Sequence, residues 1–422
     1  MPLILFSNFL FVEMNQLYIQ CALKCRIIFI VHRKIMFEEF LTPLNLSSFI
    51  DEKSMHESQW GKQIKFNTEG IEDLIGIDLA IIGVMEDRGS LRNSGCAEAP
   101  DAVRHHLYKL YKQQYDLNVA DLGNIIRGVT MRDTYVALSK LVAELLRMKI
   151  VPIIIGGSHD LTYAQYGGYQ ELEEIINVAI VDSFIDIREN ETEINSDNYL
   201  MRLMMHQPNY LFNYSHIAYQ THFTPPHTLE TLDKLHFDLF RLGKLFDGTV
   251  ELEPVLRATN MLSFDISAVR YSDAPGNRNS TPNGLRGEDA CQIARYAGLS
   301  EQMTSFGLYE INPLVDDREQ TVQLAAQMIW YFADGFYSRR KEQPRDNDES
   351  FTKYIIHFRQ NHYEMTFWKS IKSDMWWMEV PVGGRGRIRR KNKVLPCSYE
   401  DYQLASKEEL PERWLKAYHK LS

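Results

Sequence analysis

Short apolar runs alternate with segments of helical spacing through the central part of the chain. The first run, 79–84, reads LAIIGV and contains no charged or amide side chain. Such runs are typical of parallel strands that are buried on both faces. Strands are predicted at 79–84, 119–123, 150–155, 178–181, 217–219, 261–264 and 303–308. Helices are predicted at 99–104, 130–148, 161–176, 228–244, 252–259, 287–297 and 321–335. This alternation predicts an α/β fold, a three-layer α/β/α arrangement around a mainly parallel sheet.

The patterning changes at both ends of this region. Residues 1–35 contain apolar patches broken by polar residues, and no patch reaches the roughly 18–20 residues of a spanning helix. The segment also lacks the basic start of a signal peptide, so we expect it to lie outside the folded domain, with translation starting at Met36. The alternative is a weak membrane-associated leader. Residues 36–78 then form a lead-in, and the α/β domain is expected at 79–337.

Residues 338–422 differ in character from the domain before them. A charged and polar stretch extends to about residue 350 and predicts an exposed linker. An aromatic-rich C-terminal extension follows and ends in a predicted helix at 411–421. Aromatic side chains bury large areas, so we expect this extension to pack on the main domain. The alternative is an interaction platform for a partner protein.

Composition narrows the class of protein. The chain has 422 residues, of which 45% are hydrophobic, and this suffices for a sizeable core. A net charge of -10 argues against general nucleic-acid binding. The five cysteines are odd in number and show no zinc-site spacing. They therefore indicate reduced thiols in a cytoplasm-like compartment.

Polar residues that could bind a metal follow several of the predicted strands. His159 comes after a Gly-Gly turn, Asp182 and Asp186 flank the turn after 178–181, and Asp265 follows 261–264. The carboxyl ends of parallel strands meet at one edge of a sheet, where ligands bind. Carboxylate and imidazole groups suit a hard divalent ion, with Mn²⁺ favoured. The alternative is a site without metal, whose carboxylates bond to backbone or to Arg188 as a substitute cation.

Motifs in a fixed order give the chain a family resemblance over about 79–335. They comprise 82–87, Asn93 with Gly95 and Pro100, 156–159, 182–186, 263–267, 274–276, 281–284 and 310–313. Together they resemble the ureohydrolases, namely arginases, agmatinases and formimidoylglutamases, with the formimidoylglutamase branch most similar. The resemblance implies an arginase-like fold and a binuclear manganese site. It also implies hydrolysis of a guanidinium or formimino carbon by a metal-bridging hydroxide.

The resemblance carries over to this chain unevenly. In the family, one metal is held by a His and three Asp residues, and all four are present. They are His159, Asp182, Asp186 and Asp265. The second metal shares two of these Asp residues and adds a His and an Asp, whose positions hold Phe184 and Ser267 here. Both ligands private to the second metal are therefore missing, and at most one divalent ion is expected.

Other family features are also weakened. The family's substrate-contacting Glu corresponds to Glu288, although the spacing is about one residue short. The loop at 189–199, where the family carries a His, contains none. Glu310 and Asn312 are expected to orient strand ends. The histidines at 206, 216, 222 and 227 match no ligand spacing and are expected in loops or at the surface.

Two hypotheses about function follow. The first is a pseudoenzyme, a ureohydrolase scaffold used for binding. It would bind a protein partner through the C-terminal extension, or copies of the chain would bind one another as a homo-oligomer. The second is a one-metal hydrolase of C–N bonds in linear amidines. We favour the first because a second metal helps to activate water and to clamp the reacting oxygens, and its ligands are absent.

Overall fold

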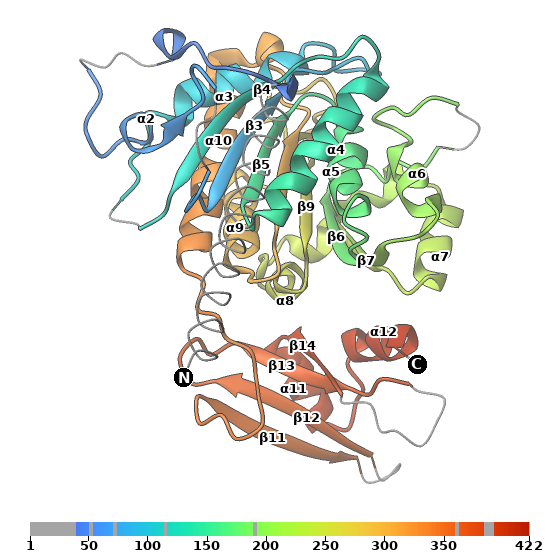
Figure 1. The fold of residues 1–422 in the computed structure, drawn as a ribbon. Coiled ribbons are helices and arrows are strands. Elements are labelled where there is room, and N and C mark those ends of the chain that lie inside the picture. The colour runs from blue at the N-terminus through green and yellow to red at the C-terminus, as the bar shows by residue number, and fades with distance from the viewer. Residues whose placement is uncertain are drawn as a thin grey trace, which may run out of the picture.

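Two β-sheets organise the chain (Figure 1). The computed structural model describes residues 39–49, 54–70, 74–113, 116–188, 192–358, 363–383 and 392–421. The expectation for residues 1–35 therefore lies outside the described residues. Within the described parts, no helix is both long and apolar enough to cross a membrane. Cys96, Cys291 and Cys397 are buried free thiols.

The larger sheet follows the order β1-β4-β3-β5-β10-β9-β6-β7-β8, and β2 pairs with β4. Its strands are β1 (Leu41–Thr42), β2 (Lys65–Phe66), β3 (Leu79–Val84), β4 (Val119–Ile125), β5 (Val151–Gly156), β6 (Ile176–Val181), β7 (Leu211–Tyr219), β8 (Asp238–Arg241), β9 (Met261–Asp265) and β10 (Ser305–Tyr309). Every described pairing is parallel except that of β1 with β4. The mainly parallel sheet is confirmed, and the lead-in at 36–78 contributes two short strands to it.

Helices cover both faces of this sheet (Figure 1). They are α2 (Trp60–Gln63), α3 (Ala99–Leu107), α4 (Met131–Arg147), α5 (Leu161–Gln170), α6 (Tyr199–Met205), α7 (Pro226–Lys234), α8 (Glu253–Arg257), α9 (Gly287–Leu299) and α10 (Gln320–Tyr337). Short 3₁₀ helices lie at Leu46–Ser48, Cys96–Glu98, Thr221–Phe223, Leu242–Leu245, Val250–Leu252, Ile266–Ala268, Pro313–Val315 and Asp317–Glu319. Alternate residues of β3 show the layering. Ile81 belongs to the core with α3, α9 and α10, whereas Ile82 belongs to the core with α4 and α5. A strand buried on both faces has no polar alternation, which is why its sequence is a continuous apolar run.

Two predicted helices were too long. The helix predicted at 161–176 ends at Gln170, and the one predicted at 228–244 ends at Lys234 and is followed by β8. Both helices are followed by a non-glycine residue with a left-handed backbone, Glu173 with φ +56° and His236 with φ +58°. Glycine is the usual residue at such positions, so the sequence carried no stop signal at either place.

The C-terminal extension forms the second sheet, an antiparallel meander in the order β11-β12-β13-β14. Its elements are β11 (Phe351–Phe358), β12 (Tyr363–Ser370), β13 (Trp376–Val380), β14 (Lys393–Cys397), α11 (Tyr399–Ser406) and α12 (Glu412–Leu421). The extension packs on the main domain, as expected: Arg257 Nη2 donates hydrogen bonds to the carbonyl oxygens of Trp376 at 2.9 Å and Cys397 at 3.3 Å. Lys420 of α12 also bonds to Asn213 of β7. The sheet itself was not predicted from the aromatic composition.

Candidate metal centre

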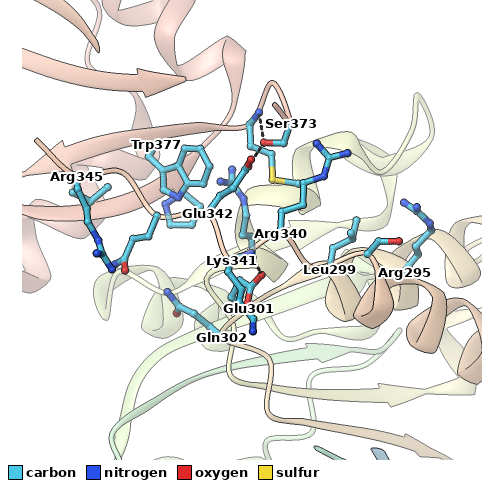
Figure 2. A pocket seen from close by; sticks show the side chains of 16 residues that line it. Arg295, Leu299, Glu301, Gln302, Arg340, Lys341, Glu342, Arg345, Ser373 and Trp377 are labelled. Carbon is cyan, nitrogen blue, oxygen red and sulfur yellow. Dashed lines mark hydrogen bonds between the residues drawn. The ribbon is translucent and has the colours of Figure 1, made fainter. Parts of the chain in front are cut away.

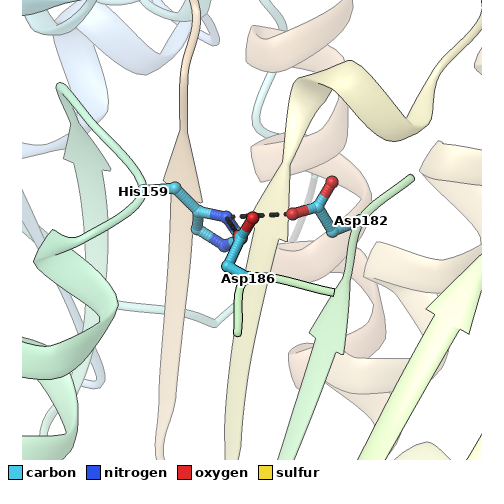
Figure 3. Close-up of side chains that lie close together, drawn as sticks. All are labelled: His159, Asp182 and Asp186. Atoms are coloured by element: carbon cyan, nitrogen blue, oxygen red, sulfur yellow. Dashed lines mark ion pairs between the residues drawn. The ribbon is translucent and has the colours of Figure 1, made fainter. Parts of the chain in front are cut away.

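The carboxyl ends of three strands, β5, β6 and β9, and the loop after β6 supply the predicted ligands. The sheet order β5-β10-β9-β6 brings the carboxyl ends of these strands together. His159 lies in the turn between β5 and α5, Asp182 directly follows β6, and Asp265 is the last residue of β9. Asp186 lies four residues beyond Asp182, and its carboxylate points back toward His159 (Figure 3).

The turn that presents His159 is held tightly. A Cβ on Gly157 would lie 1.8 Å from the carbonyl oxygen of Glu86, so only glycine fits there. The backbone N–H of His159 donates to Glu310 Oε1 at 2.9 Å. Asn93 Nδ2 in turn donates to Glu310 Oε2 at 2.8 Å and to the Glu310 carbonyl at 2.9 Å. Glu310 thus fixes the strand end that carries His159, in agreement with its expected role.

A single nitrogen of His159 faces all three carboxylates. Nδ1 lies 3.2 Å from Asp182 Oδ2, 3.4 Å from Asp186 Oδ2 and 3.3 Å from Asp265 Oδ2. The ligand atoms of His159, Asp182 and Asp186 lie within 4.8 Å of one another, while Asp265 falls outside this tighter group. An imidazole nitrogen carries at most one hydrogen, so it cannot donate to three oxygens at once. Neighbouring ligands at about 2.1 Å from a small divalent ion stand about 3 Å apart, and the three distances from Nδ1 to the carboxylate oxygens fit that spacing.

The other ring nitrogen of His159 has its own support. Nε2 lies 3.0 Å from Ser263 Oγ, and Ser263 Oγ lies 2.6 Å from Thr162 Oγ1. The Tyr199 hydroxyl lies 3.2 Å from the same nitrogen. If Nε2–H donates to Ser263, the lone pair of Nδ1 is free for a metal, as in many metal sites. Neither Thr162 nor Tyr199 was predicted from the sequence to support the ring; Tyr199 comes from α6, and no motif indicated it.

Burial makes the four ligands depend on one another. Burial and the neighbouring Asp182 charge raise the pKa of Asp186 and of Asp265 well above the ordinary value. Burial also opposes ionisation of Asp182, yet its hydrogen bond to His159 and the imidazolium charge lower its pKa overall. For His159, burial opposes the charged ring, but Asp182 and Asp186 hold its pKa well above the ordinary value. One imidazolium cannot balance three ionised carboxylates, so the site favours an added cation.

The two altered positions sit beside the ligands that a second metal would share. Asp182 Oδ1 accepts hydrogen bonds from Phe184 N at 3.0 Å and Ser267 Oγ at 3.3 Å. Asp265 Oδ1 accepts one from Ser267 N at 2.6 Å. The Phe184 ring stacks on Phe223, with ring centroids 4.6 Å apart. The donors around His159 Nδ1 suit a divalent ion, whereas the side chains of Phe184 and Ser267 offer no carboxylate or imidazole. The number of ions that the site holds stays a prediction.

Three other residues singled out in the sequence lie away from the ligand cluster or take another role in the structure. Glu288 lies in the first turn of α9 with its side chain 70% exposed, 3.5 Å from Arg286, and its contact with a substrate stays a prediction. Arg188 pairs with Asp197 at 2.6 Å, so its charge is engaged there and not by the ligand carboxylates. His216 was wrongly expected in a loop or at the surface. It lies buried in β7, and its Nε2 is 3.1 Å from the Asp182 carbonyl oxygen.

Comparisons with known proteins show which family the main domain matches. The sequence profile of the arginase family matches residues 77–334, more than half of the chain. The formimidoylglutamase of Clostridium tetani is 25% identical over 298 residues, which cover 65% of this chain and 88% of that protein.

Solved structures show the same fold. Formiminoglutamase of Trypanosoma cruzi, solved with Mn²⁺, superposes with a TM-score of 0.61 at 21% identity and covers 67% of this chain and 99% of its own. Formimidoylglutamase of Bacillus subtilis also gives 0.61 at 20% identity and covers 71% and 97%. Family match, fold and the order of the strand-end motifs coincide, and the chain belongs to the arginase family.

Proposed function

We propose that this protein binds one divalent metal ion, with Mn²⁺ favoured, and acts as a binding or scaffold protein with little or no ureohydrolase turnover. The observation that carries the proposal is what the side chains at 184 and 267 do beside Asp182. The hydroxyl of Ser267 donates to Asp182 Oδ1 at 3.3 Å, and the ring of Phe184 stacks on Phe223 at 4.6 Å, so neither offers a metal a carboxylate or an imidazole. The first half-site is thus complete in its donors, while the second has none of its own.

The retained half-site would hold the ion through His159 Nδ1 and the carboxylates of Asp182, Asp186 and Asp265. A divalent ion there would act as a Lewis acid. Three carboxylates around one dication leave a net negative charge, which weakens that action. The residues of this chain would position the ion and exclude water from it, since all four are at least about nine-tenths buried.

Proton transfer also lacks a clear agent near the centre. The described part of the loop that follows Asp186 contains no histidine. Burial raises the pKa of Glu310 to about 7, yet both of its carboxylate oxygens already accept hydrogen bonds. A general base needs a free oxygen within reach of the proton that it removes. These features favour binding over turnover.

The test combines metal content with activity. The full-length protein, prepared with excess Mn²⁺ and freed of unbound metal, should carry about one ion per chain by inductively coupled plasma mass spectrometry. Formiminoglutamate, arginine and agmatine should give no formamide or urea above the rate of a His159→Ala variant. Two tightly bound ions, or turnover abolished by His159→Ala, would contradict the proposal. Turnover with one ion would support the alternative function, a one-metal hydrolase of linear amidines.

A further inference from the structure

A second concave site lies between the main domain and the C-terminal sheet (Figure 2). Its volume is about 650 Å³, within the range of small-molecule sites. Its walls come from α8, α9, the segment that leads into β10, the linker after α10, and strands β13 and β14. Both parts of the molecule therefore build it.

This cavity is separate from the metal centre. Arg257 lies just before β9, and Glu301 and Gln302 lie just before β10, so the cavity is at the amino ends of these strands. The metal ligands stand at the carboxyl ends. A five-residue strand spans roughly 16 Å, so one small ligand cannot occupy both places.

The lining is strongly basic in a chain whose net charge is -10. Two acidic side chains line the cavity, Glu301 and Glu342. Five basic ones line it as well: Arg257, Arg295, Arg340, Lys341 and Arg345. Several arginines around one cavity suit a phosphate or carboxylate, because the guanidinium group offers paired donors in a plane.

Two side chains of the lining, Arg257 and Glu342, carry buried polar atoms that lack a hydrogen-bond partner among the described residues. In Arg257, which is 9% exposed, these atoms are Nη1 and Nε, although Nε forms an ion pair with the Glu253 carboxylate at 2.8 Å. In Glu342 the atom is Oε1, whereas Oε2 accepts from Ser373. Unpaired buried groups of this kind are costly. The Arg257 guanidinium needs an acceptor, and Glu342 Oε1 needs a donor.

Of the remaining basic groups, Arg295 is paired through Nε with Asp334 at 2.8 Å, and the other three keep donors free for a ligand. Arg340 uses Nη1 on the Lys372 carbonyl at 2.6 Å, which leaves its other N–H groups. The side chains of Lys341 and Arg345 are exposed and make no hydrogen bond within the described parts of the chain. Figure 2 shows these linker side chains beside the cavity. Partly buried Leu299 and Met375 add an apolar wall.

We propose that this cavity binds a phosphorylated small molecule that also carries a hydroxyl or amino group. A phosphate dianion offers several acceptor oxygens to the arginines and to Lys341. The hydroxyl or amino group would donate to Glu342 Oε1, and the carbon skeleton would lie on Leu299 and Met375. Because both parts of the molecule line the cavity, the ligand fastens the C-terminal extension to the main domain.

Isothermal titration calorimetry on the full chain tests this, with ribose 5-phosphate, AMP, inorganic phosphate, adenosine and citrate as probes. At least one of the two phosphate esters should bind at one per chain, more tightly than inorganic phosphate, and adenosine should not bind. The double variant Lys341→Gln/Arg345→Gln should weaken binding of that ester at least about tenfold, through two lost charge-assisted contacts.

The matched control is Arg318→Gln, at an arginine whose side chain is 89% exposed and which does not line the cavity. It should bind as the wild type does. Both replaced residues of the double variant are exposed, so an unchanged melting temperature will show that the fold is intact. Binding of citrate alone, binding of neither phosphate ester, or equal binding by the double variant would overturn the proposal.

Discussion

Replacement of Asp186 by asparagine should have opposite consequences in the metal-free and metal-loaded protein. The change removes one carboxylate oxygen that lies 3.4 Å from His159 Nδ1 and keeps the shape of the side chain. In the metal-free protein the pKa of Asp186 is raised by burial and by Asp182, so its negative charge costs free energy at pH 7. The metal-free variant should therefore melt no lower than the wild type, and as much as a few degrees higher.

The metal-loaded proteins should differ in the other direction. An ion at 100 times its Kd stabilises the folded state by about 2.7 kcal/mol. The arginase-family region, residues 77–334, has an unfolding entropy of about 0.5 kcal/mol/K at 2.1 cal/mol/K per residue. The wild type should then gain about 5 °C with Mn²⁺, whereas Asp186→Asn should gain little because an amide is a weaker ligand than a carboxylate.

Differential scanning calorimetry with and without Mn²⁺ measures both effects. The control is Asp317→Asn, whose side chain is 89% exposed and which should keep the full shift. An equal Mn²⁺ shift in wild type and Asp186→Asn would place the ion elsewhere and refute the assignment. A marked loss of stability in the metal-free variant would show that the carboxylate stabilises the apoprotein, contrary to the electrostatic argument.

Three further predictions follow from the contacts described. Phe184→His combined with Ser267→Asp should raise the metal content toward two ions per chain, measured by mass spectrometry; a content still at one would show that more than these ligands blocks the second site. Burial lowers the pKa of His216 to about 4, below its value in the unfolded chain. The unfolded state therefore binds more protons between about pH 6.5 and 4, and stability falls as pH falls. Urea titrations should show the wild type losing roughly 3 kcal/mol relative to His216→Gln over that window, and a pH-independent difference would contradict this. Arg257→Ala should lower the free energy of unfolding by about 2–4 kcal/mol, because two carbonyl oxygens lose their donor, and should speed proteolysis of the C-terminal extension; an unchanged digestion pattern would count against that contact as the fastening.

The apolar runs predicted seven strands of the main sheet, because parallel strands buried on both faces are mostly apolar; the short β1 and β2 were not predicted. The ends of α5 and α7 could not be read in the same way, because Glu173 and His236 take left-handed backbone conformations without glycine. β8 was not predicted, because it lies inside the predicted helix 228–244. It is short, and its pairing with β7 is seen only in the structure. The antiparallel sheet of the extension was not predicted, because an aromatic-rich composition indicates burial and does not indicate a strand order.

The candidate ligands were found because each follows a recognisable strand. Their mutual distances could not be derived, since these depend on which strands are neighbours, and β10 lies between β5 and β9 although it comes last of the three in sequence. The residues that support the His159 ring were even harder to predict from the sequence. Tyr199 reaches the ring from α6, beyond the loop after Asp186, and only the packed structure brings them together.

Phe184, through its backbone N–H, and Ser267, through its hydroxyl, contact the same carboxylate, and this bears on the proposal that the second half-site is closed. Asp182 Oδ1 accepts from the backbone N–H of Phe184 and from the hydroxyl of Ser267. A serine there supplies a donor to an oxygen that would otherwise be buried and only partly paired, which is costly. An aspartate at the same position without a second ion would instead add a fourth carboxylate to the cluster, and its charge would repel Asp182 and Asp265. The phenyl ring is likewise stable only where no ion needs the space, and it is stacked on Phe223. Ser267→Asp alone should therefore destabilise the metal-free protein, and we expect that a second ion needs Phe184→His as well, since the phenyl ring offers it no ligand.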